Sequence, residues 1–175
     1  METCNLGKFP IKVKYLDPSV PKISMPRGGD LGIDLYANED KVVKKGAVTL
    51  ISTGVCIQMP EGYALILKDR SSVSKHGHVL AGVLDQAYCG EIMIRMFCVG
   101  CNEYSSIESL MPGYEGFIGT PPKTMVQEPI FKINKGDKIA QAIIVPDLTY
   151  KFYIKEVEEL SETIRGDKGF GSTGR

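Results

Sequence analysis

The stretch KVVKKGAVTLISTGVCIQMPEGYALILK, residues 41–68, decides the fold. Aliphatic and β-branched residues dominate it, and Gly46, Gly54 and the turn Pro60-Glu-Gly62 interrupt it at short intervals. Short runs of this composition between glycine and proline are typical of β-strands. The stretch therefore predicts strands over 41–45, 47–51, 55–59 and 63–68.

The same pattern continues along most of the chain, and it predicts an all-β fold. Further runs are expected as strands over 79–84, 91–99, 139–145 and 151–157. No amphipathic helical pattern of a dozen residues occurs, and Arg70 to Gly77 predicts at most one short helical turn. We expect a jelly-roll-like barrel or sandwich.

Chain length predicts one domain, because 175 residues suffice for one well-packed core. We assign residues 1–160 to this domain, with an insertion at about 101–129, and residues 161–175 to a flexible C-terminal arm. So long a connection as the insertion generally has a function or lacks order.

Charge and cysteine content narrow the functional classes. The 21 basic and 21 acidic residues cancel, so no global field attracts nucleic acid or an anionic membrane. No signal peptide or membrane span is recognisable, which predicts a cytoplasmic protein, or one of the host cell cytoplasm if its source is viral. The five cysteines fit reduced thiols, and Cys98-Val-Gly-Cys101 is interpreted as an ordinary reduced pair.

The C-terminal residues RGDKGFGSTGR, 165–175, suit the binding of a nucleotide polyphosphate. Their glycines let successive N–H groups converge on phosphate oxygens, and Arg165, Ser172 and Thr173 add side-chain donors. Phe170 has no apolar neighbour in this segment, which suits a ring that stacks on a base.

Together with this tail, four other segments resemble the motifs of the trimeric deoxyuridine triphosphatases (dUTPases). In order they are GDLGIDLYA (29–37), DRSSVSKHG (69–77), AGVLDQAYCGE (81–91) and KGDKIAQA (135–142). Each motif is weak evidence alone, whereas all of them in order are specific. The resemblance implies hydrolysis of dUTP to dUMP and pyrophosphate by attack of water on the α-phosphorus, which limits uracil incorporation into DNA and supplies dUMP.

The resemblance also implies roles for the residues that read the nucleoside. Asp85 corresponds to the general base, since an ionised carboxylate can accept a proton from a held water. Tyr88 corresponds to the ring that leaves no room for a 2′-hydroxyl. The segment Ala81, Gly82, Val83 and Leu84 corresponds to the backbone that reads uracil. Without the resemblance, Asp85 would be interpreted as a turn residue and Tyr88 as a half-buried strand residue.

Further residues correspond to the phosphate end of the substrate. Arg70, Ser71 and Gln141 match positions that hold the β- and γ-phosphates, and Ser72 adds a hydroxyl to the same loop. Asp34 matches an orienting aspartate, which positions water or another chain's arginine without ligating a metal directly. In the arm, Phe170 would stack on uracil, and Arg165, Gly171, Ser172 and Thr173 would close on the substrate.

Mg²⁺ and a homotrimer complete what the resemblance implies. Mg²⁺ would be held through the triphosphate and water, with no direct protein ligand. Each site would be shared between chains. Cys89 departs from the family, because many relatives carry arginine there.

Two alternatives remain open at the level of sequence. One is a dCTP deaminase-like enzyme of the same fold, although its glutamate would fall near Arg95 and the sequence offers only Glu91. The other is a regulatory module that binds a protein partner through the insertion at 101–129. The candidates for that contact are Tyr104, Tyr114, Phe117 and Ile118.

Overall fold

The computed structural model describes residues 8–80, 82–100, 103–110, 123–159 and 161, and for 103–110 and 123–129 the backbone alone. Within these residues the chain folds into β-strands and one 3₁₀ turn. The elements are β1 (Lys12–Tyr15), β2 (Gly32–Tyr36), β3 (Lys41–Lys44), β4 (Val48–Gln58), β5 (Tyr63–Lys68), β6 (Gly77–Val79), β7 (Gly82–Leu84), β8 (Glu91–Cys98), β9 (Glu103–Leu110), β10 (Lys123–Ile133), β11 (Lys138–Pro146) and η1 (Thr149–Lys151).

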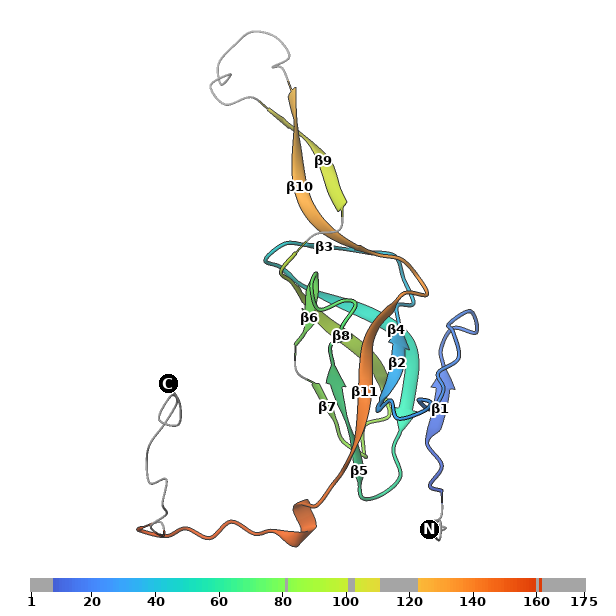
Figure 1. Cartoon of the computed structure of the whole chain (residues 1–175), viewed down its shortest axis with the longest axis vertical. Coiled ribbons are helices and arrows are strands. Elements are labelled where there is room, and N and C mark those ends of the chain that lie inside the picture. The colour runs from blue at the N-terminus through green and yellow to red at the C-terminus, as the bar shows by residue number, and fades with distance from the viewer. Residues whose placement is uncertain (1–7, 81, 101–102, 111–122, 160, 162–175) are drawn as a thin grey trace.

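The described strands pair antiparallel in sheets of order β1-β4-β8-β6, β3-β10-β9 and β2-β11-β5-β7 (Figure 1). Alternate side chains of β2, β4, β5, β8 and β11 are buried, as expected for strands with one face toward a core. Leu35, Ile51, Leu65, Ile94 and Ile139 belong to this core and are no more than 1% exposed. The expected all-β, jelly-roll-like fold is confirmed.

Strand β4 is one bulged strand, whereas the sequence predicted two strands separated by Gly54. The pairing with β8 shifts register between Ser52 and Cys56, and Gly54 has a φ of +64°. The carboxylate of Glu91 on β8 accepts hydrogen bonds from the Gly54 N–H (2.8 Å) and the Ser52 hydroxyl (2.5 Å). A bulge therefore replaces the predicted turn, because a neighbouring side chain satisfies its free backbone donor.

The remaining predicted strands agree only in part with the observed ones. The runs at 41–45, 63–68, 91–99 and 139–145 correspond to β3, β5, β8 and β11. The run at 79–84 is divided between β6 and β7, which lie in different sheets. The run at 151–157 is not a strand, since no described segment pairs with it. β1 and β2 were missed, as were the strands within the insertion.

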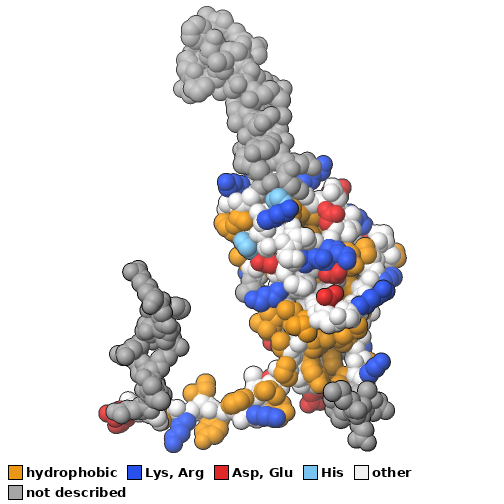
Figure 2. All heavy atoms as spheres, viewed as in Figure 1, with side chains coloured by type: hydrophobic (Ala, Val, Ile, Leu, Met, Phe, Trp, Pro, Cys, Tyr) orange, Lys and Arg blue, Asp and Glu red, His pale blue; other side chains and the backbone are white. Residues whose placement is uncertain are grey.

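Two parts of the chain leave the body in different directions. β9 and β10 pair from Lys123 opposite Leu110 to Ile130 opposite Glu103, and this hairpin projects beyond the other two sheets (Figure 1). The segment after β11 leaves from the other end of the body (Figure 2). Phe152, Tyr153 and Ile154 in it are at least 75% exposed.

Replacing Gly54 by alanine should destabilise the fold more than the same change at Gly46. Both glycines have positive φ, which costs an alanine about 1 kcal/mol. An added Cβ at Gly54 would also lie 2.8 Å from Val20 Cγ2 and 2.9 Å from Asn38 Cγ, whereas Gly46 faces open space. We expect Gly54→Ala to lower the free energy of unfolding by roughly a further 1–3 kcal/mol. Urea denaturation at one protein concentration measures both, and equal losses would contradict the crowded bulge.

Candidate functional site

Polar side chains from three neighbouring strands gather where β5 ends. Asp34 on β2 lies directly opposite Gln141 on β11, and Gln141 lies opposite Lys68 on β5. Arg70 and Ser71 follow β5 immediately. We call Asp34, Arg70, Ser71, Lys138 and Gln141 the polar cluster.

Asp34 lies between two cations of its own chain. Its Oδ1 accepts a hydrogen bond from Arg70 Nη1, and its Oδ2 lies 2.8 Å from Lys138 Nζ. Partial burial raises the pKa of Asp34, but the hydrogen bonds from Lys138 and Arg70 outweigh it, and the pKa is lowered below the ordinary carboxyl value. Asp34 is therefore an ionised carboxylate that orients two cations, and the arginine it contacts here is its own chain's.

An open pocket of about 820 Å³ lies over the polar cluster. All five members of the cluster line it, and the segment before β2 forms its other wall. The remaining lining residues are Ser24, Met25, Pro26, Arg27, Gly29, Asp30, Leu31, Gly32, Tyr36 and Ile143. Amide, hydroxyl and cationic groups around an open pocket suit the oxygens of a polyanion.

Gln141 is fixed by two neighbours. Its Nε2 donates a hydrogen bond of 2.7 Å to the carbonyl oxygen of Asp69. A Cβ on Gly32 would lie 2.2 Å from Gln141 Oε1, so the amide packs directly over this glycine. Gly32 is therefore required by contact with Gln141, a role that the sequence did not reveal.

The loop from Arg70 to Gly77 consists of two successive helical turns that do not continue into a regular helix, in keeping with the short helical turn predicted there. Ser74 N donates to the Arg70 carbonyl (2.9 Å), and Gly77 N donates to the Val73 carbonyl (2.9 Å). Ser71 and Ser72 are exposed on it. Among the described residues, the 3₁₀ turn is η1, at 149–151.

A second group of predicted site residues surrounds the turn after β7. The Tyr88 N–H donates to the Asp85 carbonyl (3.0 Å), and the Tyr88 hydroxyl donates to the Glu91 carbonyl (2.7 Å). The Tyr88 ring lies so close to Gly90 that a Cβ there would be 2.7 Å from its hydroxyl oxygen. Asp85 and Val83 are exposed beside it. The turn thus presents a carboxylate and an aromatic ring to solvent.

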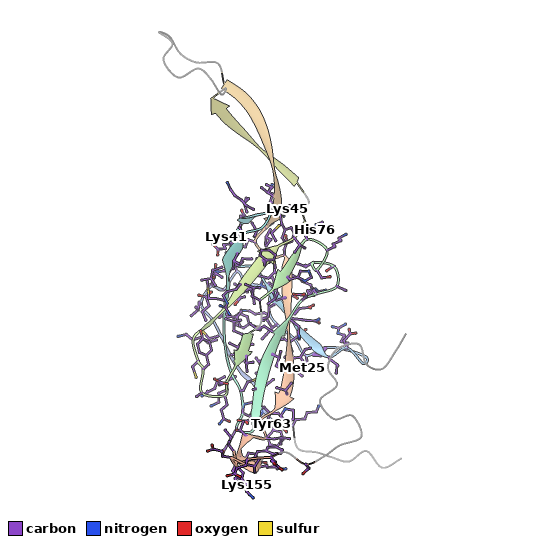
Figure 3. The ribbon with its side chains drawn as sticks, turned by 90° about the vertical axis from the view of Figure 1, so that its left-hand side faces the viewer. Met25, Lys41, Lys45, Tyr63, His76 and Lys155 are labelled. Carbon is purple, nitrogen blue, oxygen red and sulfur yellow. The ribbon has the colours of Figure 1, made fainter. Side chains whose placement is uncertain are left out.

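The two groups lie at opposite ends of β5. Leu84, next to Asp85, pairs with Leu65 near the start of the strand, whereas Arg70 follows its end. Five residues of extended chain span roughly 17 Å. Figure 3 shows the same separation, with Tyr63 at one end of the body and His76 at the other. One chain therefore does not bring Asp85 to the polar cluster.

Several predicted site residues lie outside the described part of the chain. These are Ala81, Arg165, Phe170, Gly171, Ser172 and Thr173. Lys138 was missed as a member of the cluster, although it lies within the motif at 135–142 and its charge beside the expected glutamine was the available signal.

Neither a metal cluster nor a deaminase-like glutamate is found in the described residues. No three His, Cys, Asp or Glu side chains among them come together as a metal site. Glu91 is the glutamate considered for deamination, and its carboxylate binds Ser52 and Gly54 in the β4 bulge. Its role in this structure is to stabilise the strand.

Comparison with known proteins agrees with the motifs. The dUTPase family model matches residues 19–108 and 125–174, which is most of the chain. The chain belongs to the dUTPase family. Its members hydrolyse dUTP to dUMP and pyrophosphate, and this is the reaction of the present chain.

Individual relatives match nearly the whole chain. The deoxyuridine 5′-triphosphate nucleotidohydrolase of Clostridioides difficile is 33% identical over 170 residues, covering 95% of this chain and 99% of its own. The structure of Staphylococcus bacteriophage 80alpha dUTPase with dUpNHpp is 28% identical with a TM-score of 0.73, covering 96% of this chain and 100% of its own. Phage dUTPases, of which this bacteriophage 80alpha protein is one, are described as controlling transfer of virulence genes.

A third relative concerns metal binding. A mutant dUTPase from phage phi11 of S. aureus is 29% identical with a TM-score of 0.66, covering 88% of this chain and 100% of its own, and is described with a structural Mg(II) ion.

None of the described residues of the present chain forms a helix of the length and apolar character needed to cross a membrane.

Acidification should reveal the ionised state of Asp34. The pKa of Asp34 is lower in the folded chain than in the unfolded chain, so the unfolded chain binds more protons in the acidic range. Ionised Asp34 therefore stabilises the fold at pH values above the ordinary carboxyl pKa. This stabilisation is lost as the pH falls through the pKa that Asp34 has in the folded chain. We expect Asp34→Asn to lose less free energy of unfolding than the wild type between about pH 5 and pH 3. Urea denaturation, normalised to each protein at pH 7, measures this. Parallel losses would show that Asp34 is not a stabilising anion.

Proposed function

We propose that the polar cluster binds the β- and γ-phosphates of dUTP. The observation that carries this is the open pocket in which Arg70, Ser71 and Gln141 converge, with Arg70 oriented by Asp34. A planar guanidinium suits bidentate contact with phosphate oxygens. Lys138 adds a second cation, and Gly32 lets the Gln141 amide lie at the pocket wall.

At the other end of the substrate, the turn after β7 reads the nucleoside and performs the chemistry. Asp85 accepts a proton from a water molecule, whose oxygen bonds to the α-phosphorus as the bond from that phosphorus to the bridging oxygen breaks. Pyrophosphate leaves. Tyr88 excludes a 2′-hydroxyl, and the backbone of 81–84 recognises uracil. The arm at 161–175 closes on this complex through Phe170, Arg165, Gly171, Ser172 and Thr173.

Mg²⁺ is proposed to bind with the triphosphate. Both carboxylate oxygens of Asp34 face cations, so the cluster offers amide, hydroxyl and cationic groups to phosphate oxygens and no protein cage to a metal. When bound, Mg²⁺ neutralises charge on the phosphates. The residues of the chain need only hold and orient the phosphate oxygens around it.

The separation of Asp85 from the polar cluster supports a homotrimer with shared sites. Within one chain the two groups are too far apart to contact adjacent phosphates of one nucleotide. A cyclic trimer brings the turn of one chain to the cluster of the next, and closes after three copies.

Complementation between two inactive variants tests both the base and the sharing of sites. We expect Asp85→Asn to lower kcat by about 10²–10⁴-fold. Arg70→Ala should raise the KM for dUTP so far that this variant is inactive at dUTP concentrations near the wild-type KM, where all rates are compared. If one chain supplies Asp85 and another supplies Arg70, every mixed trimer keeps one intact site. Co-expressed, differently tagged and doubly purified trimers should therefore recover about one third of the wild-type rate.

The controls for complementation are the two parent variants and dCTP, dTTP and UTP as substrates. Each parent alone should stay inactive, and pyrophosphate release should be confined to dUTP. Mixed trimers no more active than their parents would place both groups of each site in one chain. A folded wild type that leaves dUTP intact would overturn the assignment of the reaction.

We propose a second role for the β9–β10 hairpin, as a surface that binds a partner protein. It projects from the body, and its outer part lies between the two segments that match the family model (Figure 1). The similar phage 80alpha protein is described in a work on control of gene transfer. Such a surface would act beside catalysis.

Shortening the hairpin tests this second role. Ser106 lies opposite Gln127, so joining them through an Asn-Gly turn removes 107–126 while keeping the pairing of β10 with β3. We expect the shortened chain to keep its dUTP turnover and its trimer mass. It should no longer bind proteins that the full-length chain binds from an extract. Loss of the trimer or of turnover would instead assign the hairpin to assembly or catalysis.

A further inference from the structure

Asp69 closes the base of the loop that carries Arg70. Its Oδ1 accepts the Val79 N–H at 2.5 Å, and its Oδ2 lies 2.7 Å from His78 Nδ1. Asp69 immediately follows β5, whereas His78 and Val79 belong to β6. One carboxylate therefore joins the start of the loop to its end, across sequence separations of 9 and 10 residues.

The backbone of the same residue holds a second member of the polar cluster. The carbonyl oxygen of Asp69 accepts the hydrogen bond from Gln141 Nε2 at 2.7 Å. Arg70 follows in sequence and pairs with Asp34. The place of Asp69 thus determines where both the Arg70 backbone and the Gln141 amide lie.

The contacts of Asp69 orient the polar cluster more than they stabilise the fold. The side chains of Asp69 and His78 are 31% and 48% exposed, and an exposed pair of this kind contributes little to the free energy of unfolding. Small displacements of groups that bind a reacting substrate have larger effects, because binding and rate depend on their mutual geometry. Closing the loop takes an acceptor for the Val79 N–H and a second polar atom for the His78 ring, and the Asp69 side chain supplies both.

We propose that Asp69 is a positioning residue for dUTP hydrolysis. By tying the loop to β6 and carrying the acceptor for Gln141, it holds Arg70 and Gln141 at the spacing that the phosphates require. The proposal gives Asp69 no contact with the substrate, and it rests on the phosphate role proposed above for the polar cluster. His78 assists by fixing the second carboxylate oxygen.

Binding of two nucleotides separates this role from a general loss of structure. Asp69→Ala should weaken the binding of dUpNHpp, and raise the KM for dUTP, by about three- to tenfold, with a smaller fall in kcat. Binding of dUMP, which lacks the β- and γ-phosphates, should stay within about twofold of the wild type. Asp69→Asn keeps an acceptor for Val79 and an amide for His78, and should restore most of the dUpNHpp affinity.

Matched variants make each outcome decisive. Asp17→Ala removes another carboxylate that bridges a turn and a lysine, and should leave both affinities unchanged. Equal weakening of dUMP and dUpNHpp by Asp69→Ala, or no rescue by Asp69→Asn, would overturn the proposal. If Asp69→Ala does not fold, His78→Ala removes only the ring contact and must still weaken dUpNHpp selectively. If Arg70→Ala leaves dUpNHpp binding intact, the phosphate role itself is wrong.

Discussion

Hydrogen bonding along both edges of β5 is the constraint on which the proposed site depends. β11 pairs with one edge and β7 with the other. The first pairing brings Gln141, and through it Asp34, to the end of β5 where Arg70 begins its loop. The second carries Asp85 toward the start of the strand. The distance between the polar cluster and the turn that carries Asp85 is therefore set by the length of one fully paired strand.

Charge balance in the polar cluster prepares it for a polyanion. Asp34 holds Arg70 and Lys138 within a partly exposed pocket before a substrate is bound. In the proposed function, an incoming triphosphate would meet cations whose positions are already restricted, which lowers the cost of ordering them. The carboxylate also keeps these two like charges from repelling one another without compensation. Its ionised state, favoured by both partners, is what makes this arrangement stable at neutral pH.

The sequence predicted the fold class and the segments of the site better than it predicted their arrangement. Hydrophobic alternation located β3, β5, β8 and β11, because each buries one face. It misread Gly54 as a turn, since local composition does not show that Glu91 from a distant strand satisfies the bulge. Gly32 and Lys138 were missed for the same reason: their roles depend on contacts with Gln141 and Asp34 across a sheet.

The separation of Asp85 from Arg70 along β5 has a genetic consequence in the proposed trimer. Each chain would contribute its polar cluster to one substrate site and its Asp85 turn to another. A defect at one end of β5 and a defect at the other end would therefore impair different sites of the trimer. A single damaged copy would then affect sites that its intact partners also serve. A chain damaged at one end would inactivate one of the three sites, and a chain damaged at both ends would inactivate two. Only alleles damaged at both ends should therefore show dominance, whereas pairs of alleles damaged at opposite ends should compensate one another.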